Sequence, residues 1–295
     1  MAGRDDADQA GAAAGRDAAP TRRILLHLGV QKTGSTAFHN LLMRNADALA
    51  DRLVLRTPHE GTPMRPLGRA AVAYALHPDK DSERRLTDAA TLVREELPDD
   101  HRTVLISHEN LAGAMPGNGG ETRLFPALPG IVAVLDRVFK RIGRPEFVVC
   151  TRDLASWRPS VWAQAVRTDG YAGDYDRFLA ETGDLPGWDD LAARLRDQVG
   201  GARLHLLRYE DQPDSARPWS QILALAGIDD AGLAALEPMV ARPMARLPEG
   251  ATEFLRRLNA LNLNPHPRDR VADLVAGSAH LFAAGPTAPR GTARD

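Results

Sequence analysis

Short apolar runs alternate along the chain with longer amphipathic segments. Apolar runs rich in Val, Ile or Leu and bounded by polar residues predict strands at 23–28, 103–107, 146–151 and 203–208, with a weaker one at 53–56. The segments between them have the apolar spacing of helices, which we expect at 36–44, 70–77, 82–96, 131–142, 155–168, 188–198, 219–226, 251–261 and 267–276. This alternation is typical of βαβ units, and it predicts an α/β fold with a central parallel sheet flanked by helices.

The two ends of the chain break this pattern. Residues 1–22 and 286–295 contain almost no large apolar side chains, so they cannot offset the entropy cost of ordering and are predicted to be disordered tails. The part between them, 23–285, is predicted to be one domain. Its Pro- and Gly-rich stretches at 58–68 and 113–130 are interpreted as long loops or lids within that domain.

Composition narrows the class of protein. The chain has 43% hydrophobic and 26% charged residues, as in ordinary soluble proteins, and its net charge of −2 disfavours nucleic acid as a bulk partner. A local basic cleft remains compatible with that charge. No apolar run approaches the roughly 20 residues that span a bilayer, and no signal peptide is recognisable. A single cysteine, Cys150, lies in an apolar strand and is expected to be buried and inert, so we expect a cytoplasmic protein.

The first predicted strand is followed by a candidate phosphate site. Gly29 and Gly34 are five residues apart, as in a nucleotide P-loop, but Ser35 occupies the place of the P-loop lysine and Lys32 lies inside the loop. Only three of the 37 basic residues are lysine, and a compact ammonium can bind between phosphate oxygens where a planar guanidinium does not fit. Backbone N–H groups at the start of the following helix would complete the site. The residues proposed to bind the anion are Gln31, Lys32, Thr33, Gly34, Ser35 and Thr36. The alternative is a plain strand-to-helix turn in which Ser35 or Thr36 is an N-cap.

A second candidate anion site follows the strand at 146–151. Arg152 lies at the carboxyl end of that strand, on the edge where parallel sheets bind ligands, and Ser160 follows eight residues later on a predicted helix. A guanidinium and a hydroxyl together suit a second phosphate. The alternative is a surface pair between Arg152 and Asp153.

Three motifs resemble those of one enzyme family. Residues 31–36, Gln-Lys-Thr-Gly-Ser-Thr, resemble the 5′-phosphosulfate loop of sulfotransferases that use 3′-phosphoadenosine 5′-phosphosulfate (PAPS). Arg152 and Ser160 resemble the family's 3′-phosphate motif, and 206–211, ending in Tyr-Glu-Asp, resembles a later strand. Gln31 replaces a common proline, Ala37 replaces a frequent tryptophan, and the C-terminal region is more similar to bacterial and carbohydrate-type members.

The resemblance implies a P-loop NTPase-like sulfotransferase fold, PAPS as co-substrate, 3′,5′-adenosine diphosphate as product and no required metal. The sulfuryl group would move to a hydroxyl or amine of a small-molecule, lipid or carbohydrate acceptor. Tyr209 is interpreted as packing near the adenine, and Trp157 or Trp162 as lining the cleft; the alternative is that these aromatic residues belong to the core. No metal-ligand spacing of histidines is present on the expected helices.

Catalysis of that transfer needs a base and a positive charge on the leaving phosphate. Lys32 can supply the charge, and both His108 and Glu109 follow the strand at 103–107 on the ligand edge. Alignment with the family's strand favours Glu109 as the base, with His108 as the alternative. Two rival functions remain: a P-loop kinase or NTPase, in which Glu109 would hold Mg²⁺, and a non-catalytic nucleotide-binding protein.

Overall fold

Five parallel strands form the centre of the protein in the computed structural model, which describes residues 22–183, 185–239, 247–261 and 264–282. The strand order is β2-β3-β1-β4-β5, and every neighbouring pair is parallel. The strands are β1 (Arg23–His27), β2 (Leu53–Arg56), β3 (Thr103–Ser107), β4 (Arg144–Thr151) and β5 (Leu204–Arg208). The predicted α/β fold with a central parallel sheet is therefore confirmed.

Alternate residues of each strand face opposite sides of the sheet. In β1, Ile24 and Leu26 belong to one apolar cluster, whereas Leu25 belongs to another on the opposite face. Cys150 of β4 is fully buried in the second cluster, as predicted, and burial raises the pKa of its thiol. Both faces are apolar because helices cover both.

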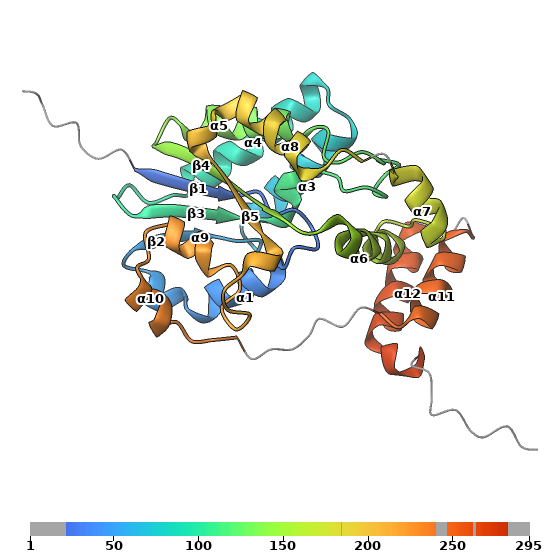
Figure 1. The fold of residues 1–295 in the computed structure, drawn as a ribbon. Helices are drawn as coiled ribbons and strands as arrows, with labels where there is room; N and C mark the ends of the chain where they lie inside the picture. The colour runs from blue at the N-terminus through green and yellow to red at the C-terminus, as the bar shows by residue number, and fades with distance from the viewer. Residues whose placement is uncertain (1–21, 184, 240–246, 262–263, 283–295) are drawn as a thin grey trace, which may run out of the picture.

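The helices divide into three groups around the sheet (Figure 1). One face is covered by α3 (Met64–Leu76), α4 (Lys80–Glu95), α5 (Leu128–Phe139) and α8 (Trp188–Val199). The other face is covered by α1 (Ser35–Arg44), α2 (Ala46–Leu49), α9 (Ser220–Leu225) and α10 (Asp230–Ala235). Beyond the carboxyl ends of the strands lie α6 (Leu154–Thr168), α7 (Tyr175–Thr182), α11 (Glu249–Asn259) and α12 (Pro265–Gly277). Short 3₁₀ turns cover Glu109–Ala112, Gly201–Arg203, Tyr209–Asp211 and Ala279–Phe282.

Most predicted helices are present with shifted ends, and both predicted loops are partly wrong. The stretch 113–130 was expected to be a loop, but α5 begins at Leu128. The stretch 58–68 was also expected to be a loop, but α3 begins at Met64. Pro63 is its N-cap and Pro66 lies in its first turn, where a residue without an N–H is tolerated because no intrahelical partner is missing. The helices α2, α7 and α10 were not predicted, because each has eight residues or fewer and too few turns to show an apolar period.

The predicted tails lie almost entirely outside the described residues. Of 1–22 only Arg22 is described, and its guanidinium donates to the carbonyls of Arg102 at 3.0 Å and Pro98 at 2.8 Å. The prediction for 286–295 concerns residues that are not described. Within the part of the chain that is described, no helix has both the length and the apolar character needed to cross a membrane.

Candidate functional site

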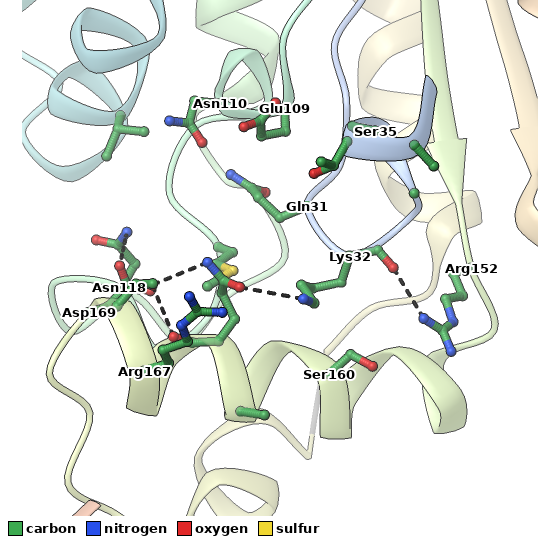
Figure 2. Close-up of a pocket in the computed structure, with 18 of the residues that line it drawn as sticks. Gln31, Lys32, Ser35, Glu109, Asn110, Asn118, Arg152, Ser160, Arg167 and Asp169 are labelled. Atoms are coloured by element: carbon green, nitrogen blue, oxygen red, sulfur yellow. Dashed lines mark hydrogen bonds between the residues drawn. The ribbon is translucent and has the colours of Figure 1, made fainter. Parts of the chain in front are cut away.

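A cavity of about 1100 Å³ opens at the carboxyl edge of the sheet. Its lining includes a residue from the segment that follows each of four strands: Gln31 after β1, Glu109 after β3, Arg152 after β4 and Tyr209 after β5. Helices α3 and α6 form the outer walls, and Figure 2 shows polar side chains from the segments after β1 and β3 and from α6 around the cavity. Cavities at this edge of a parallel sheet are the usual location of ligand sites in α/β proteins.

The phosphate cradle, which we define as residues 31–36, forms one end of this cavity. The N-cap of α1 is Gly34, with φ of 95°, and no side chain caps the helix. The alternative reading of Ser35 or Thr36 as the N-cap is therefore wrong. Both residues line the cavity, and the Ser35 hydroxyl is buried without a hydrogen-bond partner. The first N–H groups of a helix have no intrahelical acceptor, so an anion here would be bound by N–H groups, the hydroxyl and the helix dipole.

Two buried tryptophan side chains stabilise the cradle by hydrogen bonds to its backbone. The Nε1–H of Trp157 donates to the Gln31 carbonyl at 2.8 Å, and the Nε1–H of Trp219 donates to the Thr33 carbonyl at 3.0 Å. Both rings are fully buried, so Trp157 is a support of the loop and does not line the cavity. The Thr33 hydroxyl donates to the Val30 carbonyl at 2.6 Å, which turns this side chain away from the cavity. Of the six residues of the cradle, only Thr33 is absent from the lining.

Lys32 extends from the cradle toward α6. Its backbone is in the left-handed region, with φ of 66°, a conformation that is uncommon for a residue with a side chain. Its ammonium donates to Oε1 of Gln164 at 3.4 Å (Figure 2). The charge is therefore placed across the middle of the cavity, between the cradle and the residues of α6.

Arg152 occupies the opposite side of the cradle from Gln164. Its Nε donates to the Ser156 hydroxyl at 3.0 Å and its Nη1 donates to the Lys32 carbonyl at 3.3 Å. Its guanidinium also lies 5.0 Å from the centre of the Tyr209 ring. Ser160 is one turn of α6 beyond Ser156 and lines the same cavity. The predicted alternative of a pair with Asp153 is not what the structure has, because Asp153 caps α6 by accepting from the Ser156 N–H at 3.0 Å.

Tyr209 stands beside the cradle. Its ring packs edge-on against Trp219 at 6.2 Å between centroids, and 39% of the residue is exposed. A Cβ at Gly34 would lie only 3.4 Å from this ring, so the two residues are close neighbours. Contact between Tyr209 and an adenine stays a prediction. Trp162, the other aromatic suggested at the cleft, packs against Tyr175 and is not part of the lining.

The two candidate bases point in different directions. The Glu109 side chain lines the cavity and is 35% exposed, with its Oε2 buried and lacking a hydrogen-bond partner. The His108 ring is buried against α3, where a Cβ at Gly68 would lie 2.2 Å from its Nε2. Burial lowers the pKa of His108 to about 4. The geometry brings Glu109 to the cavity and leaves His108 outside its lining.

The end of the cavity farthest from Arg152, which we call the Asp169 end, was missed by sequence reasoning. It contains Asn118, Arg167 and Asp169. The apolar side chains of Leu76 and Met115 also line the cavity, and both residues lie close to the chain around Asn118. Asn118 donates to Oδ1 of Asp169 at 3.2 Å, whereas Oδ2 is buried without a partner. Burial raises the pKa of Asp169 to about 6. The only signal in the sequence was the expected loop at 113–130, which supplies Asn118 and Met115.

Comparisons with known proteins give little beyond this geometry. No family model and no curated protein match the chain. One solved structure to which the chain is similar is described as the crystal structure of a sulfotransferase from Alicyclobacillus acidocaldarius. The identity is 14%, the match covers 88% of this chain and 96% of that chain, and the TM-score is 0.43. The functional assignment therefore depends on the residues of the site.

Proposed function

We propose that this protein is a PAPS-dependent sulfotransferase that acts on a hydroxyl or amine of a small-molecule, lipid or carbohydrate acceptor. The supporting observation is that one cavity contains two separate positions whose side chains are suited to binding an anion, together with a carboxylate. The first position is the uncapped start of α1 with Ser35 and Lys32, and the second is Arg152 with Ser160. PAPS has two phosphate positions at opposite ends of its ribose, and it supplies the sulfuryl group from the 5′ end.

The cradle fits a 5′-phosphosulfate. The Ser35 hydroxyl is buried and unpartnered, and the first turn of α1 has no capping side chain, so both would gain partners from phosphate oxygens. The Lys32 ammonium lies on the inner side of this position, toward α6. There it would stabilise the negative charge that grows on the bridging oxygen as the sulfur leaves, an effect that acts mainly on the transition state.

Arg152 and Ser160 fit the 3′-phosphate. The Ser156 hydroxyl and the Lys32 carbonyl already orient the guanidinium, so little side-chain entropy is lost when an anion binds. Tyr209 lies beside Arg152 and offers a ring face or edge to an adenine. These roles are the ones that the sequence predicted for the three residues.

Glu109 is the proposed base. It would take the proton of the acceptor hydroxyl or amine while the acceptor atom bonds to sulfur and the bond from sulfur to the bridging oxygen breaks. The products are the sulfated acceptor and 3′,5′-adenosine diphosphate. The Asp169 end would hold the acceptor, and its apolar side chains and the Asp169 carboxylate suit an acceptor with an apolar part and a hydrogen-bond donor.

The decisive experiment measures nucleotide binding without metal. In EDTA, 3′,5′-adenosine diphosphate is expected to raise the melting temperature and to bind more tightly than 5′-AMP in calorimetry. Arg152→Gln should lower the affinity for the diphosphate by about 10- to 100-fold, since hydrogen bonds to charged groups contribute roughly 1.5–3 kcal/mol, and should change 5′-AMP binding little. Arg84→Gln, an exposed arginine paired with Asp81 on α4, is the control.

Two results would redirect the assignment. Stabilisation by ATP with Mg²⁺, but not by the diphosphate, would favour the kinase or NTPase alternative, which Glu109 beside the cradle keeps open. Tight binding of the diphosphate without transfer of label from ³⁵S-PAPS to any component of a cell extract would favour a non-catalytic nucleotide-binding protein.

A further inference from the structure

A row of buried polar side chains leads from the centre of the sheet to Glu109. Nδ1 of His27, on β1, lies 2.7 Å from the Ser107 hydroxyl, on β3. The same hydroxyl lies 2.8 Å from Nε2 of His39, on α1. On the far side of that ring, Nδ1 of His39 lies 3.7 Å from Oε2 of Glu109. Three elements of the core therefore contribute one side chain each to a line that ends at the cavity.

Both imidazoles in this row are neutral at physiological pH. His27 and Ser107 are completely buried, and His39 is 7% exposed. Burial lowers the pKa of His27 to about 3 and that of His39 to about 4. A neutral imidazole has one N–H and one lone pair, so each ring can donate from only one nitrogen.

The negative charge of Glu109 favours a proton on the nitrogen of His39 that faces it. Oε2 of Glu109 is buried and has no hydrogen-bond partner, and two imidazole nitrogens approach it: Nδ1 of His39 at 3.7 Å and Nδ1 of His108 at 3.6 Å. Nδ1 of His108 already accepts the Asn110 N–H at 3.1 Å, so its proton is on Nε2 and it cannot donate to Glu109. Nδ1 of His39 is the nitrogen left to donate.

Only one assignment of donors and acceptors fits the other side chains of the row. With the proton on Nδ1 of His39, its Nε2 accepts from the Ser107 hydroxyl, and the Ser107 oxygen accepts from Nδ1 of His27. Nε2 of His27, which is buried without a partner, is then a lone pair. In the reverse assignment, His39 would donate to Ser107 and Ser107 would donate to His27. The N–H on Nε2 of His27 would then be buried with no acceptor, and a lone pair of His39 would face the Glu109 carboxylate.

We propose that His39 is a positioning residue for Glu109, and that His27 and Ser107 hold it in the tautomer whose Nδ1–H faces the carboxylate. This inference rests on the proposed role of Glu109 as base. His39 is on α1, one turn after Ser35 and Thr36, so the same helix positions the cradle and, through His39, Glu109. A shift of α1 relative to Glu109 would separate His39 from the carboxylate.

The tautomers can be read without any substrate, by ¹⁵N NMR of the imidazole rings in the full chain at pH 7. We expect His39 to be protonated at Nδ1 and unprotonated at Nε2, and His108 to show the reverse in the same spectrum. Ser107→Ala should move His39 toward a mixture of the two forms and leave His108 unchanged. A wild-type His39 with its proton on Nε2, or a His39 that does not respond to Ser107→Ala, overturns the proposal.

The link to Glu109 has its own readouts. Glu109→Gln should shift the ¹⁵N resonance of His39 Nδ1. The ring resonances of His205, whose Nε2 lies 2.9 Å from Oε2 of Glu146, are the control and should not change. His39→Phe keeps the ring shape without the N–H, and it should slow ³⁵S transfer from PAPS by at least about 10-fold while the affinity for 3′,5′-adenosine diphosphate stays within about twofold. His39→Gln, which retains an N–H donor, should recover part of the rate.

Failure of this inference and failure of the proposed function are separable. If wild-type protein does not bind the diphosphate, the proposed function is wrong, and the NMR result still decides the arrangement of His39 and Glu109. If wild-type protein transfers label and His39→Phe transfers it equally fast, His39 has no positioning role.

Discussion

Buried polar atoms without partners gather at this cavity. The Ser35 hydroxyl, Oε1 of Gln31, Oε2 of Glu109 and Oδ2 of Asp169 are all buried and unpartnered, and all four residues are in the lining. Each such group costs roughly 1–3 kcal/mol of stability, so native proteins rarely collect them in one place without a use. We expect a bound ligand to supply the partners that Ser35, Gln31 and Asp169 lack, whereas Oε2 of Glu109 faces the N–H proposed for His39.

Lys32 is expected to affect turnover far more than binding. Replacing it with Met keeps the length of the side chain but removes the charge that would stabilise the leaving phosphate. We expect Lys32→Met to slow ³⁵S transfer from PAPS by about 10²- to 10³-fold, the usual cost of losing one such stabilising group. Its effect on binding of 3′,5′-adenosine diphosphate should be below about 10-fold. Lys140→Met, at an exposed position, is the control, and a transfer rate within about threefold of wild type would exclude the assigned role.

Asp169 should make stability depend on pH. Its pKa in the folded protein is raised to about 6, so the folded state binds this proton more tightly than the unfolded chain does. That contribution is fully present below the unfolded pKa of about 3.9 and is lost as the pH rises through 6. Asp169→Asn removes the titration, so its free energy of unfolding relative to wild type should rise by about 1–2 kcal/mol between pH 4 and pH 7.5. The exposed Asp197→Asn should show no such trend in urea titrations, and a flat difference for Asp169→Asn would contradict the burial seen here.

The residues of the cradle and Arg152 could be predicted from sequence, and those of the Asp169 end could not. Arg152 directly follows β4 and Lys32 lies in the turn between β1 and α1, so their place at the carboxyl edge of the sheet follows from local pattern alone. Asp169 lies just after α6 and meets Asn118, 51 residues earlier, only through tertiary packing. His108 and Glu109 are adjacent in the chain, yet the structure brings Glu109 to the cavity and buries the His108 ring against α3, and no spacing rule anticipates that.

At the scale of elements, the turn between β1 and α1 packs closely against the backbone that follows β3. Gly29 has φ of 48°, and a Cβ there would lie 2.6 Å from the Glu109 Cα and 3.0 Å from the His108 carbonyl. Glycine at this position is therefore needed for two reasons: the left-handed backbone, and the close approach of the chain segment that presents the candidate base. The sequence marked Gly29 only as the first glycine of a turn.

Gly29→Ala separates these two reasons when it is compared with Gly227→Ala. Gly227 also has a positive φ, of 98°, just after the end of α9, but a Cβ there meets nothing within 4 Å. Gly227→Ala should cost about 1 kcal/mol from backbone strain, and Gly29→Ala should cost about 3 kcal/mol or more because backbone must also shift. Urea midpoints at constant m-value give the comparison. Equal losses would mean that the contact with Glu109 adds nothing.

At the scale of the whole molecule, α11 and α12 pack on α6, the helix that forms one outer wall of the cavity. Asn259 of α11 and Arg268 of α12 both donate to the Val166 carbonyl near the end of α6, each at 2.7 Å. The order of strands and helices was predictable because each βα unit has its own apolar pattern. The docking of α11 and α12 on α6 was not, because it depends on a small third cluster and on these side-chain bonds.

The continuity of the cavity from Arg152 to Asp169 has a kinetic consequence. Donor and acceptor would be resident together, with direct passage of the sulfuryl group and no sulfated enzyme between two half-reactions. Double-reciprocal plots of initial velocity at several fixed PAPS concentrations should then intersect, whereas parallel lines would reveal a ping-pong sequence.

A single molecule that joins 3′,5′-adenosine diphosphate to an acceptor through a short spacer should inhibit far better than either half, because its second half binds without a further loss of translational freedom.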